Sequence, residues 1–322
     1  MKIAIGQIAP VFLDRDATVA KVITAIESAA AQDCSFIAFG ETLIPAYPLW
    51  LCRTDAARWE ADDQKQIHAK YLAEAVTLPQ PGFENAANDL QPICDAAKKL
   101  GISVMVGVAE RAADRGGHSI YCSRVFIEGH GEHAGEIRSV HRKLMPTYEE
   151  RLSWAPGDGA GLVTHPVGPF HVGGLNCWEN WLPLARAALY ATGMNLHVML
   201  WPGCIRLTND ITRFVAKEGR CFVVSASSII RPEDIPADIP SRSEMSGDES
   251  VFYDGGSCIA GPDGEWIVEP VVGREEIIVA ELDYEFVLRE RQNMDSSGHY
   301  GRPDVLQLTV NRSRQSAAKF ID

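Results

Sequence analysis

The sequence predicts an α/β fold in which two β-sheets pack against each other and helices cover their outer faces. Short runs rich in apolar and β-branched residues alternate with amphipathic helical patterns along the chain, as in folds whose helices cover sheet faces. Two of the later runs flank an Asp263-Gly264 turn and read as a hairpin, so mixed sheets are expected. Of the 322 residues, 46% are hydrophobic and 23% charged, which is typical of a globular protein with a large core.

The expected strands are short apolar runs bounded by turn residues. In chain order they cover residues 2–9, 35–40, 103–108, 122–129, 170–176, 196–201, 221–226, 257–262 and 276–283. The helices are expected where apolar residues recur every three or four positions. They cover residues 16–31, 84–100, 183–192 and 208–219.

The chain shows no internal linker, so residues 1–322 are expected to form a single domain with a short C-terminal tail from about residue 305. Residues 231–250 are rich in proline, serine and acids and read as an exposed loop.

The charge balance argues against nucleic acid and membrane surfaces as partners. Lys and Arg total 30 against 43 Asp and Glu, and the formal net charge of −13 repels phosphate backbones and anionic lipids. No apolar run is long enough to span a bilayer, and the start of the chain reads as a strand rather than a secretion signal. Eight cysteines without a C-x-x-C pair argue against a disulfide framework and favour a reducing cytoplasm.

A carboxylate follows the second predicted strand. Residues 35–48 read SFIAFGETLIPAYP, so the strand ends at Gly40 and Glu41 begins an extended loop. Ligands of layered α/β folds bind at strand ends, and burial there would raise the pKa of Glu41 toward that of a general base at neutral pH. The alternative is a glutamate that only caps or pairs within its loop.

A lysine lies in a loop that mixes charged and apolar residues. Residues 141–154 read HRKLMPTYEERLSW, with Lys143 directly after strand-like text. A solvated charged loop is the simplest interpretation, but the interleaved apolar and aromatic residues indicate that part of the loop faces a pocket. These residues are Leu144, Met145, Tyr148 and Trp154.

A cysteine lies at a predicted bend from strand to helix. In GGLNCWENWLP, residues 173–183, the strand ends before Cys177 and Pro183 opens a helix. Such an elbow exposes the turn residue, and a helix amino terminus stabilises an anion such as a thiolate. The nearest histidines in sequence, His171 and His197, lie in strand-like runs. Either the base is another kind of side chain, or Cys177 is a buried, inert residue.

Together these three stretches resemble the nitrilase superfamily of carbon-nitrogen hydrolases. The resemblance extends from GQIAP near the start to SSGHYGRPDVLQLTVN near the end, and agreement of several ordered motifs is far more specific than one short pattern. It implies a four-layer α-β-β-α sandwich. Cys-Trp-Glu after a Gly-Gly strand, with a GHY-x-RPD tail, is similar to the true nitrilase branch rather than the amidase branches.

The resemblance also implies roles for single residues. Cys177 would be the nucleophile, Glu41 its base and Lys143 the third catalytic group. A second glutamate precedes the arginine of the lysine motif, which identifies Glu150, with Glu149 one residue away as the alternative. The aromatic residues nearest these motifs would line the pocket or belong to the core. They are Tyr47, Tyr148, Trp178 and Trp201.

The implied reaction is hydrolysis of a nitrile to the carboxylic acid and ammonia through a cysteine thioimidate and a thioester. An amidase or carbamoyl-amide hydrolase could use the same triad, and a cyanide-degrading relative has similar motifs. A catalytically silent assembly module is the non-enzymatic alternative. No metal or organic cofactor is needed, and the nine histidines show no zinc-binding spacing.

The resemblance implies assembly as well. Nitrilases form dimers that stack further, so at least a homodimer is expected, with closed or short helical oligomers favoured over long fibres because the tail is short. Residues 52–76 and 231–250 are the candidate surface insertions.

Overall fold

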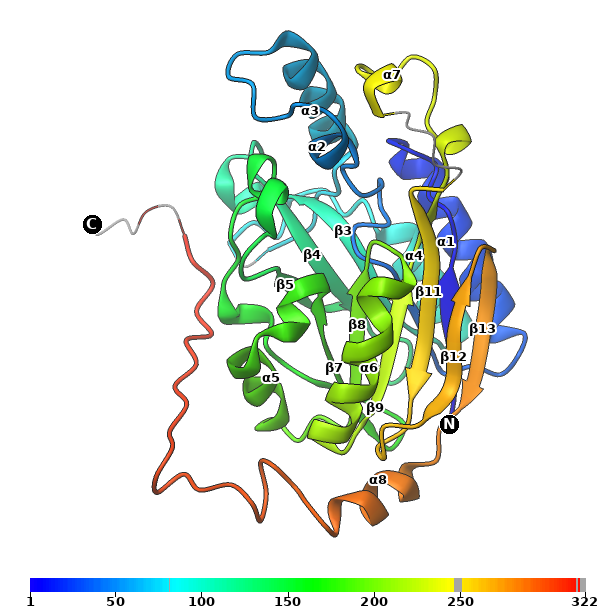
Figure 1. The fold of residues 1–322 in the computed structure, drawn as a ribbon, viewed down its shortest axis with the longest axis vertical. Helices are drawn as coiled ribbons and strands as arrows, with labels where there is room; N and C mark the ends of the chain where they lie inside the picture. Colours follow the sequence, from blue (N-terminus) through cyan, green and yellow to red (C-terminus); the bar gives the residue numbers. More distant parts are fainter. Residues whose placement is uncertain (81, 246–250, 317, 319–322) are drawn as a thin grey trace.

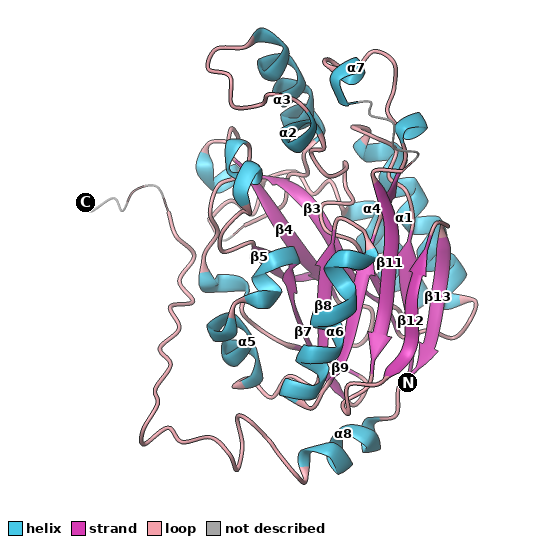
Figure 2. Cartoon of the chain, in the orientation of Figure 1, coloured by secondary structure: helices cyan, strands magenta, loops and turns pink. Residues whose placement is uncertain are grey.

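The computed structural model describes residues 1–80, 82–245, 251–316 and 318. Two sheets lie face to face with helices on both outer sides (Figure 1), and Figure 2 shows the strands enclosed between the helices. The predicted four-layer α/β sandwich is therefore confirmed.

The first sheet has six strands within the described residues, in the order β13-β1-β2-β3-β4-β5. Strands β1, β2 and β3 run parallel, whereas β13 pairs antiparallel with β1, and β4 and β5 follow as antiparallel neighbours. Their bounds are Lys2–Gln7 for β1, Phe36–Phe39 for β2, Ser103–Arg111 for β3, Ile120–Ile127 for β4, Ile137–Arg142 for β5 and Glu276–Glu281 for β13.

The second sheet has seven strands within the described residues, in the order β10-β11-β9-β8-β7-β6, with β12 paired to β11. Strands β7, β8 and β9 are parallel, and β11 pairs antiparallel with β9. The bounds are His165–Val167 for β6, Phe170–Asn176 for β7, Leu196–Trp201 for β8, Phe222–Ser227 for β9, Ile229–Ile230 for β10, Tyr253–Ala260 for β11 and Trp266–Val272 for β12.

Helices α1 and α4 cover the first sheet, and α5 and α6 cover the second (Figure 1). The short helices α2 and α7 and the longer α3 lie together at one end of the sandwich, and α8 precedes the tail. The bounds are Arg15–Ala30 for α1, Trp50–Arg53 for α2, Asp62–Glu74 for α3, Gln91–Leu100 for α4, Pro183–Tyr190 for α5, Ile205–Gly219 for α6, Arg242–Met245 for α7 and Tyr284–Arg291 for α8.

The alternating direction of side chains along each strand produces the apolar layers on the two faces of each sheet. On β1, Ile3 and Ile5 pack between the sheets whereas Ala4 faces the helices. On β8, Val198 packs between the sheets whereas Met199 belongs to the cluster under α5 and α6. Successive strand residues point to opposite faces, so these buried strands supply two apolar surfaces each and read as continuous apolar runs.

Two predicted segments differ from the structure. The helix expected over 84–100 begins only at Gln91, because Asn88 accepts a hydrogen bond from the Leu90 N–H and Asp89 accepts one from the Thr77 N–H, which holds this stretch in turns. Helices α3 and α8 were not predicted. They bury few side chains, only Val287 in the case of α8, so their apolar periodicity is weak.

The loop expected over 231–250 is less exposed than predicted, and residues 246–250 lie outside the described residues. Three apolar side chains anchor its described part in the cluster beneath α2 and α3: Ile235, Ile239 and Met245. An ion pair between Lys70 and Asp238, 3.3 Å apart, and a 2.8 Å hydrogen bond from Ser241 to Asp63 connect it to α3. Burial of these three side chains outweighs the polar composition of the segment.

After α8 the chain runs in an extended path along the outside of the sandwich (Figure 1). Asp158 fixes it there by accepting hydrogen bonds from Arg314 and from the Gln315 N–H, each at 3.0 Å. In the described part of the chain, no helix combines the length and the apolar character needed to cross a bilayer.

The packing of β3 on the end of β2 places Glu41. A side chain added at Gly107 on β3 would put its Cβ 2.3 Å from the carbonyl oxygen of Gly40 and 2.7 Å from the Cα of Glu41. These are backbone atoms that cannot rotate away, so only glycine lets β3 approach the Glu41 segment this closely.

We expect Gly107→Ala to lower the free energy of unfolding by about 1–3 kcal/mol and to displace Glu41, so that activity depending on Glu41 falls as well. Val104→Ala is the control, because it removes buried methyl groups nearer the start of β3 and should destabilise without moving Glu41. Thermal unfolding measures the loss of stability in each variant, and activity per folded molecule measures the effect on Glu41. Equal activity in the two variants would contradict the proposed role of the close approach.

Candidate functional site

Three of the predicted residues follow directly on strands whose carboxyl ends meet. Glu41 comes two residues after β2, Lys143 one residue after β5 and Cys177 one residue after β7. The first two strands belong to the six-stranded sheet and the third to the seven-stranded sheet. All three side chains are at most 3% exposed, so the packing of the two sheets brings the groups together inside the protein.

Lys143 connects two carboxylates. Its Nζ donates to Glu41 Oε1 at 2.9 Å and to Glu150 Oε2 at 2.7 Å. A carboxylate oxygen of each glutamate and the Cys177 sulfur all lie within 4.8 Å of one another. The structure therefore brings together the four residues that the sequence proposed as catalytic.

The geometry distinguishes Glu150 from Glu149. Glu150 is buried because it closes a capping box, in which its carboxylate accepts the Thr147 N–H at 2.6 Å. Its other oxygen accepts a hydrogen bond from the Tyr47 hydroxyl at 2.9 Å. Glu149 is only partly buried, so Glu150 is the glutamate that Lys143 reaches.

A second cysteine contacts the predicted base. The Cys122 thiol, on β4, donates to Glu41 Oε1 at 3.3 Å, and Cys122 is fully buried. Sequence reasoning missed this contact, because YCSRVF reads as an ordinary apolar strand and Cys122 as a packing residue. The other oxygen, Glu41 Oε2, is buried and has no protein hydrogen-bond partner among the described residues, so it is free to take a proton.

The chain around Cys177 forms the predicted elbow as a short 3-10 helix, Cys177–Trp181, followed by α5. Cys177 itself has φ +48°, an uncommon value for a residue other than glycine. The Asn180 side chain supports this conformation by donating to Leu175 O at 3.2 Å and to Cys177 O at 2.8 Å. Asn180 was not among the predicted site residues, although it lies within the same motif.

The surroundings of Cys177 favour the neutral thiol over the expected thiolate. Burial, followed by the charge of Glu41, raises the pKa of the Cys177 thiol well above its ordinary value, while Lys143 and the Trp178 N–H act in the opposite direction. A five-residue 3-10 helix cannot offset the loss of water around the sulfur. Cys177 therefore needs a base.

Glu41 has the pKa that such a base requires. Burial raises the pKa of Glu41 to about 7, with Lys143 opposing the rise and Glu150 adding to it. Burial alone would lower the pKa of Lys143, but Glu41, Cys177 and Glu150 outweigh it and raise that pKa well above its usual range. The site thus holds a permanent ammonium group beside a carboxyl group that can gain or lose a proton near neutrality.

The four aromatic candidates lie in different surroundings. Tyr47 is at the site, where its ring also packs edge-on against Trp154 and its hydroxyl contacts Glu150. Trp201 is fully buried in the cluster beneath α5 and α6, and its backbone oxygen accepts the Glu41 N–H at 3.0 Å. Contact with substrate stays a prediction for both.

Tyr148 and Trp178 lie at the surface, 71% and 46% exposed. Tyr148 has φ +42° and borders an outer pocket that also includes Leu51 and Cys52. The ring of Trp178 lies 6.1 Å from that of Trp181. Neither side chain joins the buried group of Glu41, Lys143 and Cys177, and a role in substrate binding stays a prediction for them too.

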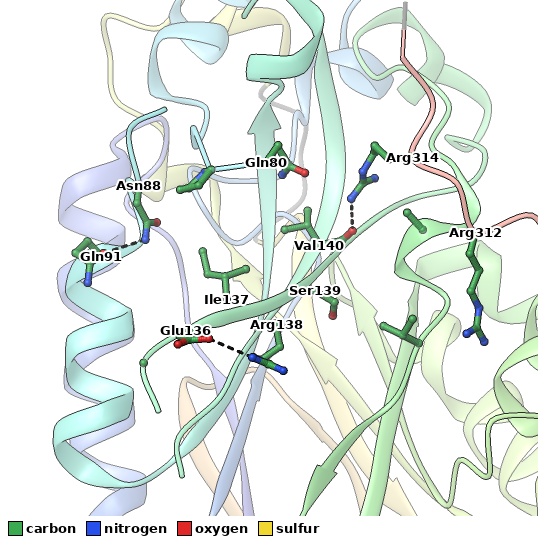
Figure 3. A pocket seen from close by; sticks show the side chains of 14 residues that line it. Gln80, Asn88, Gln91, Glu136, Ile137, Arg138, Ser139, Val140, Arg312 and Arg314 are labelled. Carbon is green, nitrogen blue, oxygen red and sulfur yellow. Dashed lines mark hydrogen bonds and ion pairs between the residues drawn. The ribbon is translucent and has the colours of Figure 1, made fainter. Parts of the chain in front are cut away.

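A pocket of about 710 Å³ lies elsewhere, between β5 and the tail (Figure 3). Two of its arginines already have partners: Arg138 pairs with Glu136, and Arg314 donates to Val140 O and Asp158. None of its lining residues belongs to the group around Cys177. The reactive side chains and this pocket are therefore separate features.

Glu41, Glu150 and Cys177 are close enough to share a metal ion, but the ammonium group of Lys143 already lies between the two carboxylates. A cation would meet this positive charge at short range. The donor set therefore fits a lysine-centred site rather than a metal centre.

Comparison with known proteins gives a consistent picture. Residues 2–290 match the carbon-nitrogen hydrolase family. The chain is 37% identical to a nitrilase from Pseudomonas syringae pv. syringae, over 97% of this chain and 90% of that protein. It is 33% identical to an aliphatic nitrilase from Rhodococcus rhodochrous, over 100% of this chain and 82% of that protein.

Solved structures share the fold. A carbon-nitrogen hydrolase from Helicobacter pylori G27 has a TM-score of 0.68 at 19% identity and covers 94% of this chain and 96% of its own. An amidase of the nitrilase superfamily from Nesterenkonia AN1 has a TM-score of 0.61 at 16% identity, over 91% and 94% of the two chains. At these identities the likeness concerns the architecture alone.

We expect kcat/KM to fall as the pH is lowered through about 7, because the carboxyl group of Glu41 then becomes protonated and loses its capacity as a base. Glu150→Gln should move this acidic limb to lower pH, by about 1 unit, because the charge of Glu150 is one cause of the raised pKa of Glu41. Glu149→Gln is the matched control and should leave the limb in place. If the pH at which kcat/KM falls is unchanged in Glu150→Gln, Glu41 is excluded as the titrating group.

Proposed function

Because this chain belongs to the carbon-nitrogen hydrolase family and, within it, to the nitrilases, we propose that it hydrolyses a nitrile to the carboxylic acid and ammonia. The observation that carries the proposal is the buried group in which Lys143 contacts Glu41 and Glu150 beside the Cys177 sulfur. A nitrile carbon is a weak electrophile, so it requires a sulfur nucleophile, a base and a cation close to the nitrogen. The group supplies all three.

In the first step Glu41 removes the proton of the Cys177 thiol while the sulfur attacks the nitrile carbon. One of the carbon–nitrogen π bonds breaks, and its electron pair moves to the nitrogen. The ammonium group of Lys143 stabilises this negative charge, and the proton held by Glu41 passes to the nitrogen. The product is a neutral thioimidate. The proximity of the three groups and the pKa of Glu41 of about 7 support this assignment.

In the second step a water molecule adds to the thioimidate carbon while Glu41 accepts the water's proton. The Trp178 N–H and Lys143, both of which lower the pKa of the Cys177 thiol, are suited to stabilise the tetrahedral intermediate. Both protons of that water, the one held by Glu41 and the one left on the hydroxyl group, pass to the nitrogen, so ammonia leaves and a thioester remains. A second water, activated in the same way, releases the carboxylic acid and restores the thiol.

Glu150 acts on Lys143 in this scheme. It holds the ammonium group at 2.7 Å and is itself held by the Thr147 N–H and the Tyr47 hydroxyl. These contacts limit the positions that Lys143 can adopt, and they support a role in orientation rather than in proton transfer.

The cellular location, the partners and the assembly of the enzyme belong to the same proposal. All eight cysteines are free, which supports a reducing cytoplasm, and the charge of −13 disfavours nucleic acid and anionic membranes as partners.

A homo-oligomer is supported by apolar side chains exposed on and around α5 and α6. They are Trp181, Leu182, Leu184 and Phe214. The single domain with a tail from about residue 305 is part of this proposal.

A panel of aliphatic, aromatic and arylaliphatic nitriles, with the matching amides in parallel, tests the activity directly. We expect ammonia and the carboxylic acid from at least one nitrile, with the matching amide converted more slowly. Ammonia and acid are measured separately from any amide product. Turnover of amides without turnover of any nitrile would contradict the proposal and favour an amidase.

Cys177→Ala is expected to abolish turnover while the protein stays folded, because the Cys177 sulfur forms the covalent intermediates of this scheme. Cys177→Ser should be nearly inactive, since a hydroxyl is hardly ionised near neutrality. Cys94→Ala is the control, because Cys94 is equally buried but lies in α4; this variant should lose some stability and keep its kcat. Substantial turnover by purified Cys177→Ala would remove Cys177 from the mechanism.

A further inference from the structure

We propose that Glu179 is a positioning residue that fixes the distance between the Cys177 thiol and the Lys143 ammonium group. The inference rests on the proposed function, in which these two groups act on adjacent atoms of the nitrile. Glu179 acts through the backbone on either side of them and does not itself touch the substrate.

The carboxylate of Glu179 joins chain segments that leave different sheets. Oε1 accepts the N–H of Leu144, the residue after Lys143, at 2.6 Å. Oε2 accepts the N–H of Asn176, the residue before Cys177, at 2.9 Å. Because β5 and β7 belong to different sheets, one carboxylate ties the sheets together directly beside the reacting groups.

The surroundings of Glu179 keep its carboxylate ionised although the residue is only 2% exposed. Burial alone would raise its pKa, but His141 and the N–H groups of Leu144 and Asn176 lower the pKa of Glu179 below its ordinary value. His141 Nε2 lies 3.1 Å from Oε2, and the fully buried Arg124 interacts favourably with the same charge. An ionised carboxylate can accept from all these donors at once.

The elbow at Cys177 needs this support. A residue held at an unfavourable φ keeps that conformation only when its surroundings over-determine it. Asn180 binds the carbonyl groups of Leu175 and Cys177, and Glu179 binds the N–H of Asn176. The two residues that follow Trp178 therefore hold the nucleophile's backbone from both directions.

Loss of the Glu179 carboxylate should separate the β5 end from the elbow. A misplacement of about 1 Å can lower a rate by about 100-fold, and the effect falls on the step in which Lys143 stabilises charge. Since Glu179 does not itself touch the substrate in this proposal, kcat should change and KM should change little.

Glu179→Gln tests this, because the amide keeps the size of the side chain but offers one acceptor oxygen where two now bind separate N–H groups. We expect kcat per active site to fall by about 10–100-fold with KM within about threefold of wild type. Active sites are counted by mass spectrometry of Cys177 after alkylation with iodoacetamide. A lower melting temperature with wild-type kcat per active site would show a purely structural role and overturn the proposal.

Two further variants complete the test. Glu275→Gln is the matched control: Glu275 also accepts a backbone N–H, that of Ala9 at 2.9 Å, and its other partners are Lys21 and Arg231 rather than residues of the site, so its kcat should stay at the wild-type value. Glu179→Asp keeps the charge and shortens the reach by one methylene group. It should also lose kcat, which tests the proposal if Glu179→Gln fails to fold, and a wild-type kcat in Glu179→Asp would overturn it.

A readout without turnover separates this inference from the proposed function. Wild-type protein inactive on every nitrile would contradict the function only. Burial and Glu41 raise the pKa of the Cys177 thiol and Lys143 lowers it. The other titratable groups that interact with the thiol are Glu150 and the buried Tyr47 and Tyr253. Moving Lys143 away should therefore shift the pH midpoint of Cys177 alkylation upward in Glu179→Gln. An unchanged midpoint would overturn the role of Glu179.

Discussion

The structure depends on one interaction, the contact of a buried ammonium group with two buried carboxyl groups. Removing one member of such a pair costs about 3–5 kcal/mol, because the charge that remains has no partner. Lys143 offers one positive charge to Glu41 and Glu150. One of the two carboxyl groups can therefore carry a proton without leaving Lys143 uncompensated, and Glu41, with its pKa of about 7, is that group. Burial is the main cause of this raised pKa and the charge of Glu150 adds to it, so the charge imbalance helps to create the base of the site.

The same interaction requires two sheets. Glu41 and Lys143 come from the six-stranded sheet and Cys177 from the seven-stranded sheet, so their separation depends on the apolar layer between the sheets. Phe36 on β2 and Val198 on β8, beside β7, belong to that layer. A change of volume there acts on the reaction centre without touching it, because close-packed interiors transmit strain.

The alternation of apolar runs and amphipathic patterns predicted the layers. The strand-end positions of Glu41, Lys143 and Cys177 made them candidates, and the resemblance to the nitrilase superfamily implied their roles. The sequence could not predict contacts between residues far apart in the chain, nor the direction in which the side chain of a loop residue points. Cys122 lies 81 residues from its carboxylate partner, and its strand looks like any other. Tyr148 lies next to the lysine motif, yet its positive φ accompanies a side chain that is exposed. Helices such as α3 were not predicted, because few of their side chains are buried and their apolar periodicity is therefore weak.

The segment at the end of the sandwich, formed by α2, α3 and residues 231–245, packs as an apolar cluster of its own. It touches the reaction centre through a relay: Tyr71 on α3 accepts a hydrogen bond from the Trp154 indole at 3.2 Å, and the Trp154 ring lies 5.6 Å from the Lys143 nitrogen. A change in the packing of α3 can therefore reach the Lys143 ammonium group through Tyr71 and Trp154, although no strand that carries the site is altered.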